Sequence, residues 1–227
     1  MLMYEKDNTL NIKFNENSND LDNPDLSISN DGIVFNGNNL VETNDVFKKL
    51  TDRTIESIVI PDSVTSIGAS AFNGCTSLTN IIIPDSVTSI GSGAFSVCTS
   101  LENIIIPDSV TSIEGSGLFN PGPFVGCTSL KNISISKNIT QIPYSFASSC
   151  TALESVVIPD GVTTIGDSAF YKCTSLDGIV IPSSVTSIGS FSFKDVAGTI
   201  NCEFSEGDVS GAPWGATGTI VYDYTGE

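Results

Sequence analysis

A repeat of 23 residues constrains the fold of this chain more than any other feature. The stretch from Ile83 to Ile105 reads IPDSVTSIGSGAFSVCTSLENII, and its pattern recurs along most of the sequence. The six copies begin at Ile60, Ile83, Ile106, Ile135, Ile158 and Ile181. The steps between these starting residues are 23, 23, 29, 23 and 23 residues. Because a fixed period of about 20 to 50 residues is typical of stacked supersecondary units, we expect one elongated array.

The spacing of apolar residues divides each repeat into a strand, a turn and a return. Leu101, Ile104 and Ile106 form the pattern L-x-x-I-x-I, which is the strand core of a leucine-rich repeat. Seven such triples predict seven parallel strands, in a sheet of about 30 Å at ~4.8 Å per strand. A Pro-Asp pair then turns the chain. The other positions that we expect to face inwards are Val87, Ile90, Ala94, Phe95 and Cys98.

We therefore predict a β-rich solenoid, a right-handed leucine-rich-repeat stack with a parallel sheet on one face. The repeats occupy residues 57–198, and non-repeat β segments cap them at 1–56 and 199–227. An open solenoid end exposes apolar coil faces, so a cap is required. The C-terminal segment provides Trp214, which we expect to cover Phe193 and Phe204, and GTIVYDY, which alternates as a final strand.

The N-terminal segment does not repeat, and we interpret it as a cap or a small attachment module. Asn30, Asp31 and Gly32 separate two short β-prone runs, which is a strong hairpin signal. The polar stretch 15–24 is expected to be a loop, and Asp45–Arg53 is expected to form one helical turn.

Two repeats depart from the pattern of one phenylalanine per coil. In QIPYSFASSC, Ala147 takes the consensus phenylalanine position and Phe146 precedes it, so we expect a repacked coil with Tyr144 filling the gap. The 29-residue repeat contains both Phe119 and Phe124, and only one of them can join the aromatic column. The other is expected on the surface of a Pro/Gly-rich bulge, Gly115–Phe124, because insertions in repeats normally emerge there.

The positions of the six cysteines argue against a disulfide framework. Five of them occupy one repeat position, and Cys202 replaces a strand isoleucine. A thiol that exchanges with isoleucine or valine behaves as a small buried hydrophobe. Stacked coils bring equivalent Cα atoms to ~4.8 Å, but the Cβ vectors run parallel and do not converge. We therefore predict reduced core thiols at Cys75, Cys98, Cys127, Cys150, Cys173 and Cys202.

The formal net charge is −17, from 26 acidic and 9 basic residues without histidine. An acidic chain without a basic stripe repels phosphate, so we expect neither nucleic acid nor an anionic membrane surface as partner. No run approaches the ~18 apolar residues of a membrane span, and the start, MLMYEKDNTL, has no apolar signal region. We expect a protein that is not exported by the usual route, a protein whose leader was removed, or a virion component; a cytoplasmic location stays open.

The repeat columns offer little for catalysis or metal binding. Without histidine there is no imidazole base, and the cysteines are core residues by position. Asp62, Asp85, Asp108 and Asp160 form an interrupted column after the repeat proline, but aspartate is also a common turn residue and nothing there encloses an ion. We therefore expect no catalytic residue, no metal and no cofactor.

The repeat unit resembles that of the BspA-like leucine-rich repeats, whose pattern reads close to I-P-x-S-V-T-S-I-G-x-x-A-F-x-x-C-T-S-L. The resemblance spans about residues 57–204. It implies a non-enzymatic surface protein of host-associated bacteria or protists, with a role in adhesion or coaggregation. The tail CEFSEGDVSGAPWGATGTIVYDYT also resembles the ends of similar arrays in gut-associated phage genomes, which implies a virion setting.

The outer face of the predicted sheet carries the candidate binding residues. In L-x-x-I-x-I, the residues on either side of the middle isoleucine face away from the core. One of these two columns is almost wholly aliphatic, and a contiguous apolar ribbon on a surface often marks an interaction site, although β-branched residues also favour strands. With the bulge residue Phe119, the candidates are Asn80, Ile82, Asn103, Ile105, Asn132, Ser134, Ser155, Val157, Gly178 and Val180.

Two hypotheses follow for the function. The first is a binding protein that recognises a protein or glycan, of host origin or a virion neighbour, through the sheet face. The second is a structural phage subunit, a decoration, fibre or tail component, that attaches through residues 1–56. The sequence leaves the oligomeric state open.

Overall fold

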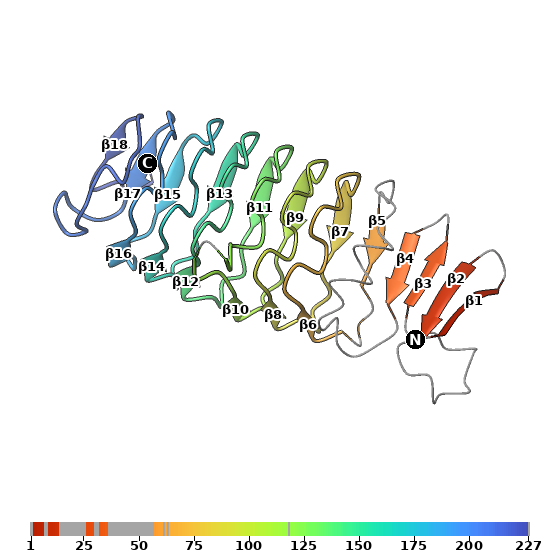
Figure 1. Cartoon of the computed structure of the whole chain (residues 1–227). Coiled ribbons are helices and arrows are strands. Elements are labelled where there is room, and N and C mark those ends of the chain that lie inside the picture. Colours follow the sequence, from red (N-terminus) through yellow and green to blue (C-terminus); the bar gives the residue numbers. More distant parts are fainter. Residues whose placement is uncertain are drawn as a thin grey trace.

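The computed structural model is an elongated solenoid whose coils stack side by side from the N-terminal to the C-terminal end (Figure 1). It describes residues 2–6, 9–13, 26–29, 32–35, 57–60, 62, 64–117 and 119–226. Six coils begin at the repeat isoleucines given above and are numbered one to six in chain order. The described residues contain strands and turns and no helix, which confirms the predicted leucine-rich-repeat stack.

The long strands lie along one side of the solenoid and pair in parallel. Equivalent repeat positions are in register: Asn132 of one strand pairs with Asn103 and with Ser155 of its two neighbours. Two six-stranded sheets, ending at β7 and β9, lie next to each other along this side (Figure 1). The parallel strands are β5 (Ser57–Val59), β7 (Asn80–Ile82), β9 (Asn103–Ile105), β11 (Asn132–Ser134), β13 (Ser155–Val157), β15 (Ile179–Ile181), β17 (Ile200–Cys202) and β18 (Ile220–Val221).

Short strands line the opposite side, at the return of each repeat that the spacing of residues such as Val87 and Ile90 predicts. They form two three-stranded parallel sheets, which are interrupted between the third and fourth coils. The first sheet contains β6 (Ser66–Ile67), β8 (Ser89–Ile90) and β10 (Ser112–Ile113). The second sheet contains β12 (Gln141–Ile142), β14 (Thr164–Ile165) and β16 (Ser187–Ile188). The interruption follows the bulge, which emerges directly after β10.

Four N-terminal strands continue the first long sheet. They are β1 (Leu2–Lys6), β2 (Thr9–Lys13), β3 (Leu26–Ser29) and β4 (Gly32–Phe35). They pair antiparallel from β1 to β4, and β4 then pairs in parallel with β5. The pairing of β3 with β4 confirms the predicted hairpin. The expected loop at 15–24 and the expected helical turn at 45–53 lie outside the described residues.

The inward repeat positions form one continuous core. Val87, Ile90, Ala94, Phe95 and Cys98 are completely buried, as the spacing predicts. The predicted core position of the cysteines is confirmed, since all six are buried free thiols. Burial raises the pKa of the Cys173 and Cys202 thiols to about 12.

The aromatic column runs through all six coils without a gap. Neighbouring rings of regular coils are stacked, for example Phe72 on Phe95 with centroids 5.3 Å apart. In the fourth coil Ala147 keeps the backbone position of the consensus phenylalanine, and Phe146 fills the column from the preceding position with its ring edge-on to Phe124 and Phe170. The expectation that Tyr144 fills the gap is therefore wrong, because the neighbouring Phe146 supplies the missing volume.

The C-terminal segment caps the last coil. Trp214 is buried and packs edge-on against both Phe193 and Phe204, with centroids 6.3 and 6.4 Å apart, which confirms the predicted cover. Its indole N–H donates to the carbonyl of Ser210 at 2.9 Å, so the polar atom is satisfied within the cap. The expected final strand is present as β18, which pairs with β17.

Candidate binding surface

The outer face of the long sheet exposes large aliphatic side chains. Strands β7, β9, β11 and β13 alternate exposed, buried and exposed, because only the middle residue of each faces the core. The side chains of Ile82, Ile105 and Val157 are 72%, 68% and 76% exposed. Val180 is half-buried, and Ser134 places a polar residue between Ile105 and Val157. The apolar ribbon therefore has two parts, one at Ile82 and Ile105 and one at Val157.

The polar column beside this ribbon bonds along the stack. The side-chain amide of Asn132 donates to Asn103 Oδ1 at 2.9 Å, and Ser155 Oγ donates to Asn132 Oδ1 at 3.0 Å. Asn80, at the N-terminal side, and Gly178, at the C-terminal side, are the exposed members outside this ladder. Because the amides already bond to one another, the column supports the sheet, and a ligand would have to compete with these bonds.

A shallow hollow opens where the apolar ribbon is interrupted. It has a volume of about 690 Å³ and lies between the ends of β11 and β13 and the turns that follow them. Ser134 and Val157 line it on the sheet side, and Lys137, Asp160 and Gly161 line it on the turn side. The small side chain of Ser134 and the lack of a side chain at Gly161 leave this space unfilled.

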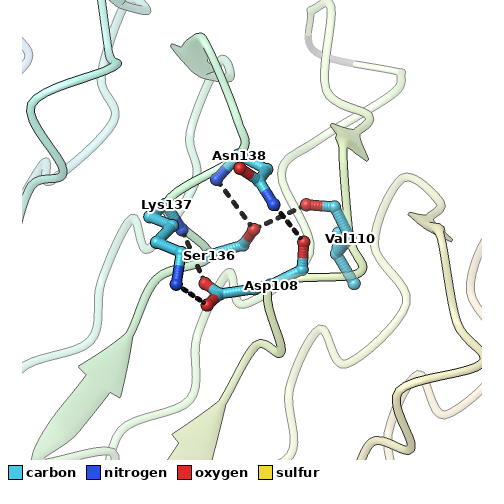
Figure 2. A network of polar contacts seen from close by, with 5 residues as sticks. All are labelled: Asp108, Val110, Ser136, Lys137 and Asn138. Carbon is cyan, nitrogen blue, oxygen red and sulfur yellow. Dashed lines mark hydrogen bonds and ion pairs between the residues drawn. The ribbon is translucent and has the colours of Figure 1, made fainter.

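The turn of the fourth coil lines one side of the hollow. Its residues are Ser136, Lys137 and Asn138 in place of the consensus Pro-Asp-Ser, and Figure 2 shows them reaching towards the preceding coil. Ser136 Oγ donates to the carbonyl of Val110 at 2.6 Å, and the Asn138 amide donates to the carbonyl of Asp108 at 2.7 Å. The turn is thus bonded to the third coil.

An ion pair completes this network. The backbone N–H of Lys137 donates to Asp108 Oδ1 at 3.1 Å, and its ammonium pairs with the same carboxylate (Figure 2). These hydrogen bonds from Lys137 hold the pKa of the Asp108 carboxyl below its ordinary value. The departure of I-S-K-N from I-P-D-S is visible in the sequence, but the hollow beside Ser134 becomes visible only when neighbouring coils are placed side by side.

The bulge of the third coil presents one aromatic side chain to solvent. Phe124 is completely buried in the aromatic column, whereas Phe119 is 97% exposed, which confirms that the two residues divide as predicted. Gly117 and Asn120 form an isolated bridge that closes the tip of the bulge around Phe119. The bulge follows β10, so Phe119 does not extend the sheet-face ribbon; the structure does not bring this candidate together with the other ten.

The described residues contain no group of three or more acidic or cysteine side chains placed to hold a metal ion. The aspartates that follow the repeat proline lie in turns, and one of them, Asp108, forms an ion pair with Lys137. Among the described residues there is also no helix of the length and apolarity that a membrane crossing needs.

Comparison with known families agrees with this geometry. The family model of the BspA type leucine rich repeat region matches residues 43–150 and 119–209, in six copies. The chain belongs to the BspA-type leucine-rich-repeat family. Proteins of this BspA type are repeat proteins without enzymatic activity.

Two solved structures show the same kind of stack. A leucine-rich repeat protein from Bacteroides ovatus is 25% identical, with a TM-score of 0.58, over 74% of this chain and 45% of that one. The T. pallidum leucine-rich repeat protein TpLRR has the same identity and TM-score, over 78% of this chain and 81% of that one. This BspA-type chain thus spans less than half of the Bacteroides ovatus protein. No curated protein sequence matches it.

Proposed function

We propose that this protein binds a protein partner through the outer face of its long sheet, at a bacterial surface or on a virion. The observation that carries this proposal is the exposure of Ile82, Ile105 and Val157 on the solvent-facing side of strands β7, β9 and β13. Strand propensity alone accounts for β-branched residues, but threonine would satisfy it without exposing aliphatic surface. Apolar side chains gathered on one face are typical of an interaction surface.

The hollow beside Ser134 adds shape to this surface. Adjacent coils are ~4.8 Å apart, so the interruption at Ser134 separates Ile105 from Val157 by about two coil spacings. A partner side chain that enters this space contacts Ser134 and Val157, which line it. An interface gains most from a few anchors that fill a pocket, and a bulky apolar side chain of the partner suits this one.

The first experiment removes the apolar ribbon without disturbing the core. The double variant Ile82→Lys and Ile105→Lys changes two exposed side chains on neighbouring strands. Two lysine ammonium groups at the centre of an apolar contact would lose their water without gaining an ion pair. We therefore expect the affinity for the protein that binds the sheet face to fall by at least about a hundredfold. The matched control is Thr88→Lys with Thr111→Lys, which adds the same charge at two exposed positions on the opposite side, in the second and third coils.

The outcome separates the two functional hypotheses. Candidate partners are identified by crosslinking on the surface of the source cell or virion and are then measured by biolayer interferometry with purified components. The proposal fails if the sheet-face double variant binds as tightly as the wild type. If removal of residues 1–56 abolishes assembly while the double variant assembles normally, the structural alternative with attachment through 1–56 is the better description.

A further inference from the structure

Four side chains form an aromatic–lysine cluster on the last two coils, away from the sheet face. The cluster consists of Tyr171, Lys172, Phe191 and Lys194. The first two lie between β14 and β15, and the other two lie between β16 and β17, where the chain returns from the short strand to the long one. Lys172 Nζ is 5.1 Å from the centroid of the Tyr171 ring, and Lys194 Nζ is 5.8 Å from that ring and 5.2 Å from the Phe191 ring.

The cluster holds the positive charge that the array leaves uncompensated. Residues 57–226 contain four lysines and no arginine. Lys131 and Lys137 form ion pairs with Glu102 and Asp108, whereas no ion pair of Lys172 or Lys194 occurs within the described part of the chain. Asp195 follows Lys194 directly but does not pair with it. In a chain of net charge −17, this cluster is therefore the place on the array where an anion is attracted.

The phenylalanine of the cluster departs from the repeat in a costly way. Phe191 has a φ of 58°, and the equivalent positions of other coils, with the same left-handed backbone, are the small residues Ser70, Gly93, Ser145 and Ser168. A bulky residue is unfavourable in this conformation. Burial does not compensate for it, because 56% of the Phe191 side chain is exposed. Strained outliers of this kind tend to occur where a ligand is bound.

The chemistry of the cluster selects a ligand that carries both an apolar face and one negative charge. The electron-rich face of an aromatic ring attracts polarised C–H groups, such as those on the face of a sugar ring. An ammonium group donates strong charge-assisted hydrogen bonds to a carboxylate. An acidic protein segment would bring several more charges against an acidic chain, whereas a terminal sugar acid brings one.

We propose that the aromatic–lysine cluster binds the terminal, carboxylate-bearing sugar of a glycan. The sugar ring packs on the exposed side of Phe191, and Lys172 and Lys194 donate to the carboxylate. Tyr171 holds both ammonium groups in place, since each lies within 6 Å of its ring centroid. This site is separate from the sheet face and does not depend on the protein partner proposed above.

The test uses the full chain and defined oligosaccharides in isothermal titration calorimetry. Oligosaccharides ending in glucuronic acid or sialic acid are compared with the same chains ending in the neutral sugar. We expect the acid-terminated probes to bind at least about tenfold more tightly than the neutral ones. The affinity is also expected to fall as sodium chloride rises from about 50 to about 300 mM, because salt screens the exposed charges.

Two variants connect the binding to the cluster. Phe191→Ser introduces serine, which occupies the equivalent position in three other coils, so we expect the fold to be retained. Lys194→Gln removes one charge. Each is expected to weaken binding of the acid-terminated probes by at least about tenfold. Lys131→Gln, a lysine on the sheet side, and the double variant Ile82→Lys with Ile105→Lys serve as controls and should bind these probes like the wild type.

Three results would overturn the proposal. The first is equal affinity for acid-terminated and neutral probes. The second is unchanged affinity in both Phe191→Ser and Lys194→Gln while circular dichroism shows a wild-type fold. The third is tighter binding of a polyglutamate peptide than of either acidic sugar, which would assign the cluster to an acidic protein segment.

Discussion

The second and fifth coils follow the 23-residue repeat closely, whereas the third and fourth depart from it in three places. The third coil contains the bulge with Phe119, the fourth replaces the Pro-Asp-Ser turn by Ser136–Asn138, and it also exchanges the order of Ala and Phe. The long strands remain in register through all of these changes. The return sheet, in contrast, is interrupted at this point.

This difference shows which parts of the repeat the stack requires. The aromatic column needs one phenylalanine ring per coil but accepts it from either of two backbone positions, as Phe146 shows. The outer positions are free to vary because they face solvent and not the core. Function can therefore arise where the surface departs from the repeat, as at the hollow beside Ser134, while the core stays constant.

The largest expected effect tests whether the edge-on ring of the fourth coil matters as much as a stacked one. Phe146→Ala and Phe170→Ala each leave a cavity in the column, and we expect each to lower the free energy of unfolding by about 3 to 5 kcal/mol. Chemical denaturation checks both variants. Phe119→Ala is the control and should change stability by less than about 0.5 kcal/mol, because its side chain is exposed.

The edge-on ring would be shown to matter less than the stacked one if Phe146→Ala lowered the free energy of unfolding by less than about 1 kcal/mol while Phe170→Ala lowered it by about 3 to 5 kcal/mol. It would mean that the fourth coil is loosely packed and that its exchanged Ala and Phe do not preserve the core.

A smaller effect tests the closeness of the backbones. A Cβ on Gly91 would lie 2.5 Å from Ala69 N, and a Cβ on Gly122 would lie 2.5 Å from Phe146 Cα. The regular second coil and the irregular third coil thus both approach a neighbour too closely for a side chain. We expect Gly91→Ala and Gly122→Ala each to cost about 1 to 3 kcal/mol in thermal or chemical unfolding.

Gly161 provides the control for this pair of glycine variants. It lines the hollow, and a Cβ there would meet Lys137 O at 3.4 Å, which is ordinary contact. Gly161→Ala should therefore be neutral or slightly stabilising. If Gly122→Ala is as mild as Gly161→Ala, the bulge gives the third coil more freedom than the structure shows.

The smallest effect concerns the pH dependence of the irregular turn. The pKa of Asp108 is lowered in the folded state by Lys137, so its ion pair stabilises the fold above the unfolded carboxyl pKa of about 3.9. This contribution is lost as the pH falls through the lower, folded pKa. Asp108→Asn should thus reduce Tm slightly at neutral pH and should converge with the wild type in acid.

The matched variant is Asp85→Asn, at the equivalent turn of the regular second coil, where the described residues form no ion pair. Its Tm difference from the wild type is expected to be smaller than that of Asp108→Asn at neutral pH. Equal differences for the two variants at every pH would show that Lys137 adds nothing to the fourth turn.

The sequence predicted the stack itself because the repeat spacing directly encodes which side chains face inwards. The exposure of Ile82 and Ile105, the burial of the cysteines and the division between Phe119 and Phe124 all follow from that spacing. The prediction from the sequence was wrong at Tyr144, because the exchanged order of Phe146 and Ala147 does not show which side chain fills the aromatic column. The fate of the Asn103 and Asn132 amides also required the structure, because their bonds join side chains from neighbouring coils.

The aromatic–lysine cluster and the hollow illustrate the limit of sequence reasoning. Phe191 stands where other coils have serine or glycine, so its oddity can be read from an alignment of the repeats. That its ring meets Lys194, and that Lys194 also meets Tyr171 of the preceding coil, depends on distances between coils. A repeat determines periodic positions, whereas surface sites arise from residues that break the period, and only their packing in space decides which of them meet.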